Sequence, residues 1–231
     1  MTAAAIFDLE RVVVPEHFTR LAIDELAKAD VSLGGLRTPL LWVRRLTDRW
    51  GETLPSLFFG ARAIKGLAGV SRSGLAAVGA ELAGVAEVTV YPWAQEMVVR
   101  GSAEGHRTVL ATPFPLDLIA PLAERLGFDQ VIATQLRVDH AGEYDGTIDG
   151  EWIWGIQKAR AVKYWARANA VDLGASTAYS GAVSDVPLLR QVGSPVVVNP
   201  DARLAPIAYV AQWPVLWPDS PPHTGKPRRT P

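Results

Sequence analysis

Four polar side chains with complementary chemistry lie at the ends of predicted strands or at the start of a predicted helix. Asp8, Thr112 and Asp185 each follow a short apolar run, and Lys158 begins a helical segment. Because ligands of open parallel sheets bind beyond the carboxyl ends of the strands, we expect these side chains to meet. A carboxylate nucleophile, a hydroxyl, an ammonium and a second carboxylate are the groups that phosphoryl transfer uses. The pattern predicts a phosphate-sized site.

Each of these residues also has a purely structural interpretation. An acid at a strand end is commonly a helix cap or a surface carboxylate, which applies to Asp8, and Asp185 precedes a helix that it could cap. Lys158 could lie along an apolar surface with its ammonium in water. Thr112 could simply end a strand. Glu10, two residues after Asp8, could be a solvated acid paired with its neighbour, an arginine.

Apolar and helical segments alternate through most of the chain. The apolar runs suit buried strands and lie at residues 3–7, 108–111, 130–134, 176–179 and 196–198 and around 215. Helical periodicity occupies residues 116–126, 157–169, 186–192 and 202–210. Residues 137–138 and 144–148 flank a turn-rich stretch and predict a hairpin. This order predicts an α/β fold, a parallel sheet with helices on both faces.

Residues 15–100 show helical periodicity with little strand signal. We therefore expect a helical cap inserted into the α/β core. The core then comprises residues 1–14 and 101–218. The final segment, residues 219–231, is rich in proline and polar residues and is expected to be disordered.

The composition excludes several classes of protein. With 231 residues, 48% of them hydrophobic and 20% charged, the chain is typical of globular proteins. A net charge of -1 provides no field to hold a nucleic-acid backbone, so we expect no nucleic-acid partner. The absence of cysteine excludes thiolate chemistry and fits a reducing compartment. Without a signal-peptide pattern or a membrane-length apolar run, we expect a cytoplasmic protein of undetermined oligomeric state.

The motifs together resemble those of the haloacid dehalogenase (HAD) superfamily, in its subfamily IB, the phosphoserine-phosphatase-like branch. The resemblance lies in FDLERVVV (residues 7–14), LATPFPLDLIAPLAERLGFDQVIAT (110–134), GEYDGTIDG (142–150), IQK (156–158) and AYSGAVSDVPLLRQVGSPVVVNPD (178–201). The stretch GETLPSL (51–57) is similar to HAD modules fused to actinobacterial glycerolipid acyltransferases. The resemblance implies a Rossmann-like core with a helical cap.

The resemblance also implies roles for individual residues. Asp8 would be the nucleophile that forms an aspartyl-phosphate, and Glu10 the general acid and base. Thr112 and Lys158 would hold the phosphate, with Lys158 offsetting its charge. Mg²⁺ would be held by Asp8, the carbonyl of Glu10 and Asp185. The implied substrate is a small phosphorylated metabolite or a lipid-like phosphate.

Three positions depart from the family pattern. Gly181 stands where the family has a magnesium-binding aspartate, Glu10 replaces an aspartate, and Val12 replaces a threonine. Because glycine supplies no side-chain ligand, we expect a phosphatase-like protein with reduced or lost catalysis. The alternative is a non-catalytic binding or assembly protein with the same fold, and a third, metal-free dehalogenase chemistry fits the motifs least well. Recovery of Mg²⁺-dependent activity in Gly181→Asp would identify the missing ligand as the cause, whereas failure with intact folding would point to Glu10 and Val12.

Overall fold

The computed structural model of the chain describes residues 2–16, 18–29, 31 and 54–218. The predicted disordered tail, residues 219–231, lies outside the described residues, and so do residues 32–53 of the predicted cap.

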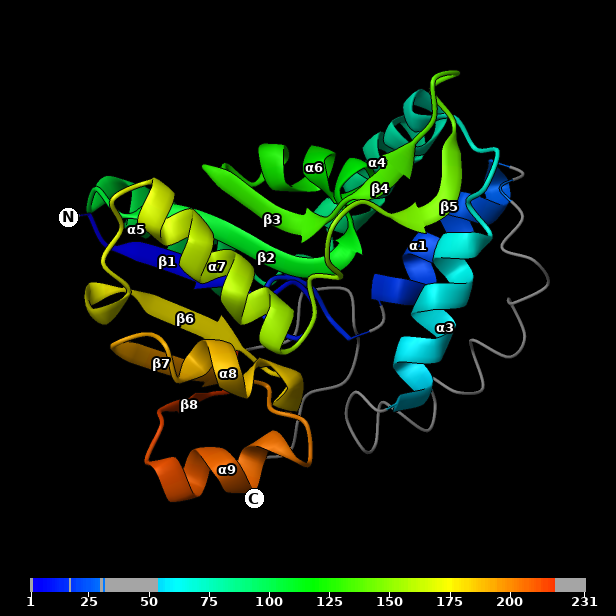
Figure 1. Cartoon of the computed structure of the whole chain (residues 1–231). Helices are drawn as coiled ribbons and strands as arrows, with labels where there is room; N and C mark the ends of the chain where they lie inside the picture. The colour runs from blue at the N-terminus through cyan, green and yellow to red at the C-terminus, as the bar shows by residue number, and fades with distance from the viewer. Residues whose placement is uncertain (1, 17, 30, 32–53, 219–231) are drawn as a thin grey trace.

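Six parallel strands form one sheet in the order β3-β2-β1-β6-β7-β8, which confirms the predicted α/β fold (Figure 1). The strands are β1 (Ala4–Phe7), β2 (Arg107–Pro115), β3 (Gln130–Thr134), β6 (Thr177–Ser180), β7 (Ser194–Val198) and β8 (Val215–Leu216). Because β1 lies between β2 and β6, the residue that follows it, Asp8, is at the centre of the carboxyl edge.

The side chains of β1 alternate between two apolar clusters. Ala5 and Phe7 belong to one cluster, and Ala4 and Ile6 belong to the other. Successive strand residues point to opposite faces, so each cluster covers one face of the sheet. All four side chains are buried, which is the pattern of a strand covered on both sides.

Helices pack against both faces of the sheet and contribute side chains to each cluster. The Phe7 cluster includes side chains of α4 (Arg72–Glu87), α5 (Pro92–Ala103) and α6 (Leu116–Arg125). The Ile6 cluster includes side chains of α7 (Ile156–Ala168), α8 (Val186–Leu189) and α9 (Leu204–Ala211). Helix α8 ends at Leu189, whereas the predicted helix extended to residue 192.

The predicted cap segment contributes four described helices. They are α1 (Phe18–Lys28), α3 (Leu54–Lys65), α4 and α5. Helix α4 packs against α1 and α6, whereas α5 packs against β1 and β2. Gly101 permits this second contact, because a Cβ there would lie 3.2 Å from Thr108 Cγ2 and 3.5 Å from the Ala5 Cβ. Helix α5 therefore covers the sheet itself.

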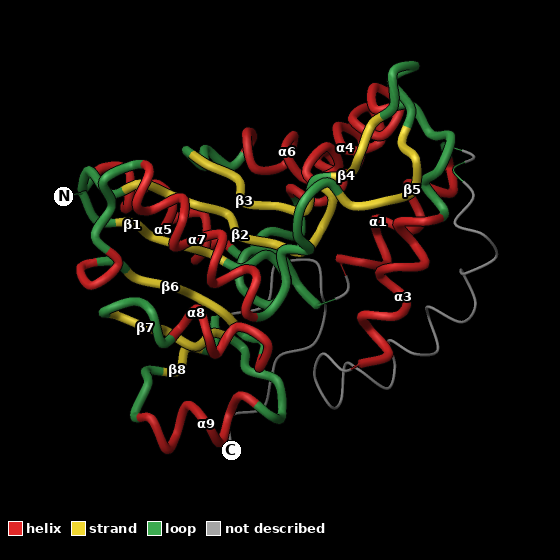
Figure 2. The backbone as a smooth tube through the Cα atoms, in the orientation of Figure 1, coloured by secondary structure: helices red, strands yellow, loops and turns green. Residues whose placement is uncertain are grey.

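The predicted hairpin is confirmed as the antiparallel pair β4 (Leu136–Val138) and β5 (Tyr144–Ile148). Figure 2 shows it apart from the six-stranded sheet, and β5 contacts α3. The Gly69 N–H donates to the Tyr144 carbonyl, and the Tyr144 N–H donates to the Val70 carbonyl. These bonds attach the hairpin to the segment between α3 and α4.

Within the described ranges, no single helix is long and apolar enough to cross a membrane. Helices α4 and α5 reach the required length and apolarity only as a pair, and they are bent by 108° at the break between them.

Candidate active site

Asp8 is held at the carboxyl end of the central strand. Its N–H donates to the Tyr179 carbonyl on β6 over 3.0 Å, so its backbone continues the pairing of β1 with β6. Only 5% of the residue is exposed. Burial of a carboxylate is costly unless the charge is compensated, so Asp8 needs a partner of opposite charge.

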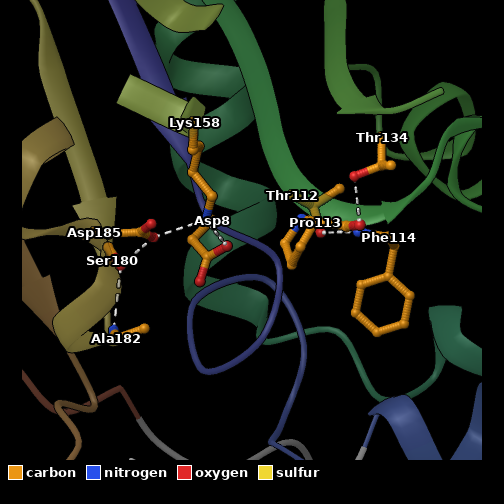
Figure 3. Close-up of polar contacts among 9 residues, drawn as sticks. All are labelled: Asp8, Thr112, Pro113, Phe114, Thr134, Lys158, Ser180, Ala182 and Asp185. Atoms are coloured by element: carbon orange, nitrogen blue, oxygen red, sulfur yellow. Dashed lines mark hydrogen bonds and ion pairs between the residues drawn. The ribbon is translucent and has the colours of Figure 1, made fainter. Parts of the chain in front are cut away.

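Lys158 supplies that charge. Its Nζ donates to Asp8 Oδ1 and to Asp185 Oδ2, at 2.8 Å in each case (Figure 3). Lys158 is 2% exposed, so its ammonium is buried between the two carboxylates. The residue lies in the first turn of α7, which follows Gly155, a residue with φ of 56° in the region that favours glycine. The tight turn at Gly155 thus directs the start of α7 toward the sheet edge.

Asp185 is the third member of the cluster. It ends the 3₁₀ turn η2 (Val183–Asp185) just before α8 and is fully buried. Its Oδ2 accepts hydrogen bonds from Lys158 Nζ and from Ser180 Oγ, both at 2.8 Å. Its Oδ1 is buried without a hydrogen-bond partner. The structure therefore brings Asp8, Lys158 and Asp185 together, as the sequence predicted.

Ser180 was not predicted as a site residue. It is the last residue of β6, fully buried, and its Oγ also accepts from the Ala182 N–H at 3.2 Å. The sequence signal was its place at the end of a strand, the same feature that identified Asp8. Its hydroxyl fixes the orientation of Asp185.

Thr112 lies on β2, the strand beside β1, and is fully buried. The prediction that it follows the strand end was wrong, because β2 continues to Pro115 with a register shift between Thr112 and Pro115. The Thr112 Oγ1 accepts a hydrogen bond from the Phe114 N–H at 3.4 Å. Figure 3 shows this group beside the Asp8, Lys158 and Asp185 cluster, without a drawn contact to it.

Glu10 contacts the start of α1. Its Oε1 accepts hydrogen bonds from the backbone N–H and the hydroxyl of Thr19, at 3.0 and 2.9 Å. These bonds satisfy a free N–H group in the first turn of the helix. Arg11, which the sequence suggested as an ion-pair partner of Glu10, pairs with Glu16 over 3.1 Å.

Val12, in place of the family threonine, is fully buried in the Phe7 cluster. It therefore serves packing in this chain.

Gly181 follows β6 in a crowded backbone environment. A Cβ at this position would collide with the carbonyl oxygen of Val198 and lie 2.9 Å from the Cβ of Arg11. The described residues contain no group of three histidine, cysteine, aspartate or glutamate side chains that could hold a metal ion. Because position 181 has no room for a ligand side chain and Lys158 already takes one oxygen from each of Asp8 and Asp185, the residues present do not fit the Mg²⁺ site that the resemblance implies.

The cluster has the charges of a carboxylate nucleophile beside a cation. Its three buried side chains carry two negative charges and one positive charge when ionised. Nearby, Tyr179 stacks on Phe7 with 4.7 Å between ring centroids, and burial raises the pKa of its phenol.

Comparisons with known proteins agree with the α/β fold. A family model described as haloacid dehalogenase-like hydrolase matches residues 5–190. The phosphoserine phosphatase SerB1 of Mycobacterium tuberculosis is 39% identical over 110 residues, which are 47% of this chain and 35% of that protein. The chain spans less than half the length of the first curated relatives that it matches, 46% of one and 35% of another.

Two solved structures share the fold. A protein of unknown function from Bordetella pertussis Tohama I has a TM-score of 0.75 and 26% identity, over 94% of this chain and 99% of that one. A probable phosphoserine phosphatase from Vibrio cholerae has a TM-score of 0.63 and 16% identity, over 89% of this chain and 58% of that one.

Proposed function

Because this chain belongs to the haloacid dehalogenase-like hydrolase family, we propose that it hydrolyses a small phosphomonoester through Asp8, at a reduced rate. The observation that carries the proposal is the position of Lys158 Nζ, 2.8 Å from Asp8 Oδ1 and from Asp185 Oδ2. A buried ammonium beside a carboxylate at a strand end compensates the charge of a phosphate that approaches the carboxylate.

The reaction has two steps. In the first, a carboxylate oxygen of Asp8 forms a bond to phosphorus while the bond from phosphorus to the ester oxygen breaks. The leaving alkoxide takes a proton from Glu10. In the second, Glu10 accepts a proton from water, the water oxygen attacks phosphorus, and inorganic phosphate leaves with Asp8 restored. Thr112 and Lys158 hold the phosphate oxygens.

The rate is reduced because the charge of the site is incompletely compensated. A phosphate dianion meets two carboxylates and one ammonium, and position 181 contributes neither a ligand nor a charge. Removal of one preorganised electrostatic group from an active site commonly lowers kcat by about 10²–10³. We expect turnover below that of a family member with complete motifs by this order.

The relatives support the substrate class that we propose. One of them is named a phosphoserine phosphatase, and small phosphomonoesters of this kind are the first to test. The assay uses p-nitrophenyl phosphate and phosphoserine, with a lipid phosphate in micelles as a separate arm. Slow release of phosphate by the native chain that disappears in Asp8→Asn supports the proposal. Asp149→Asn, the same change at an exposed position, is the matched control and should leave turnover unchanged.

A second function is favoured by one observation. The space around Gly181 is filled by backbone atoms, which is the environment of a packing residue. The alternative is a non-catalytic protein that keeps the fold as a binding or assembly module. Equal phosphate release from the native chain and Asp8→Asn would support this alternative and reject hydrolysis.

A further inference from the structure

The space for a side chain at position 181 is closed by backbone. A Cβ on Gly181 would collide with the Val198 carbonyl oxygen and lie 3.1 Å from the Asn199 carbonyl oxygen. Backbone atoms of a strand end cannot rotate aside as a flexible side chain can. A larger residue at position 181 therefore requires the end of β7 to move.

Arg11 and Asn199 hold this closure in place. The Asn199 Nδ2 donates to the Arg11 carbonyl at 2.9 Å, and Arg11 Nη1 donates to the Asn199 carbonyl at 3.4 Å. Both residues have positive φ angles, 70° for Arg11 and 44° for Asn199. Such angles are unfavourable for residues other than glycine and persist only where surrounding contacts impose them.

The residues that follow β6 are also hydrogen-bonded to the segment after β7. The Asp201 N–H donates to the Gly181 carbonyl at 2.8 Å, and Asp201 Oδ2 accepts from the Val183 N–H at 2.9 Å. Gly181 is thus enclosed by the loop after β1 and by the segment after β7. Neighbouring atoms fill the space that a side chain at position 181 would occupy, so the glycine does not leave an open ligand position.

Part of the positive charge that a metal would supply is already present between the two carboxylates. Lys158 Nζ lies within hydrogen-bond distance of one oxygen from each, and these two oxygens come from residues far apart in the sequence. A divalent ion placed between the same oxygens would be repelled by the buried ammonium. One oxygen of each carboxylate is therefore committed to the lysine.

We propose that this site works with the Lys158 ammonium as its cation and does not take up Mg²⁺, and that the closure at Gly181 prevents a single substitution from restoring a metal site. The inference rests on the proposed function for the identity of the site, but its test measures metal binding and not turnover. It also predicts the outcome of the Gly181→Asp substitution, which the sequence left open.

The first measurement is the melting temperature of the native chain in MgCl₂ or MnCl₂, against NaCl of equal ionic strength. We expect equal melting temperatures and no binding heat in calorimetry. A rise specific to the divalent salt, or a binding isotherm, would overturn the inference.

The second measurement uses Gly181→Asp beside Gly84→Asp. Gly84 lies in α4 with no atom near its potential Cβ, so it controls for the added charge without the collision. We expect Gly181→Asp to lower the melting temperature more than Gly84→Asp and to gain no stabilisation from Mg²⁺. Mg²⁺-specific stabilisation of Gly181→Asp would show that the position is open and would refute the inference.

The third measurement removes the ammonium. Lys158→Met leaves Asp8 and Asp185 buried with like charges, and a divalent ion then becomes the only available bridge. We expect a lowered melting temperature that MgCl₂ or MnCl₂ raises by a few degrees and NaCl does not. Lys158→Met combined with Asp185→Asn removes one of the two charges and should lose this rescue. A folded Lys158→Met without rescue would contradict the inference, and if it does not fold, the first two measurements still decide.

The two proposals fail separately. Equal phosphate release by the native chain and Asp8→Asn rejects hydrolysis and leaves the cation assignment standing. Divalent binding by the native chain rejects the cation assignment and leaves slow hydrolysis standing.

Discussion

Ser180 Oγ donates a 2.8 Å hydrogen bond to Asp185 Oδ2, which joins the end of β6 to the carboxylate that faces Lys158. Both residues are fully buried, so no water replaces this bond when it is lost. The relationship makes Ser180 a positioning residue whose contribution is measurable.

We expect Ser180→Ala to lower the free energy of unfolding by about 1–3 kcal/mol, because a buried charged acceptor loses a donor. Urea denaturation at pH 7 measures the change. Ser102→Ala, an exposed serine in α5, is the control and should change the free energy little. Equal stability of Ser180→Ala and the native chain would contradict the role of this bond.

The Tyr144 hydroxyl donates to Asp117 Oδ2 at 2.8 Å, and Asp117 also pairs with Arg72. Because this bond is made to a charged group, Tyr144→Phe should lower stability by about 1.5–3 kcal/mol at pH 7. Chemical denaturation gives the difference. Tyr164→Phe, at a side chain that is 69% exposed, should be close to neutral.

The same tyrosine makes stability depend on alkaline pH. Burial, followed by the hydrogen bond to Asp117, raises the pKa of Tyr144 above its ordinary value of 10.0. The folded chain therefore keeps a proton that the unfolded chain releases. Stability from this group is complete below about pH 10 and falls as the pH rises above it.

Tyr144→Phe should flatten this alkaline loss of stability. Burial also raises the pKa of Tyr179, so part of the dependence of stability on pH should remain in this variant. The free energy of unfolding between pH 8 and pH 11 measures it. An unchanged slope in Tyr144→Phe would show that Tyr144 ionises normally in the folded chain.

Two glycines of the same helix should respond in opposite directions to alanine. In α4, a Cβ on Gly79 would lie 2.7 Å from the Leu118 carbonyl oxygen and 2.9 Å from that of Asp117, whereas one on Gly84 meets nothing. We expect Gly79→Ala to destabilise the packing of α4 on α6. Gly84→Ala should stabilise by about 0.5–1 kcal/mol, the usual helix preference for alanine. Thermal unfolding of both variants tests the contrast, which fails if both move the same way.

Asp201 organises the segment after β7. Its Oδ1 accepts from the backbone N–H groups of Arg203 and Leu204, and its Oδ2 accepts from the Val183 N–H. Asp201→Ala should lower stability by about 0.5–2 kcal/mol, as loss of a capping side chain does. Hydrogen exchange should quicken at the amides of Val183 and Leu204, with amides in β2 as the internal reference. Unchanged protection at both amides would contradict this role.

The sequence predicted the sheet because a strand that is buried on both faces needs apolar residues at consecutive positions. The runs at β1 and β7 are short, apolar and followed by polar residues, which is what a central parallel strand requires. The position of Asp8 followed directly from the end of β1. Thr112 was misplaced by the same reasoning, because a register shift lets β2 continue past it and such shifts leave no clear mark in a single sequence.

What the sequence determined by itself is the order of strands and helices along the chain, and the place of Asp8 at the end of the central strand. Only the tertiary structure decided that Lys158 bridges two carboxylates, that Glu10 binds the start of α1, and that Gly181 has no room for a side chain. The physical reason is the distance along the chain between the residues that interact. Periodicity records how each residue is buried, whereas an ion pair or a steric collision between distant segments depends on how the whole chain packs.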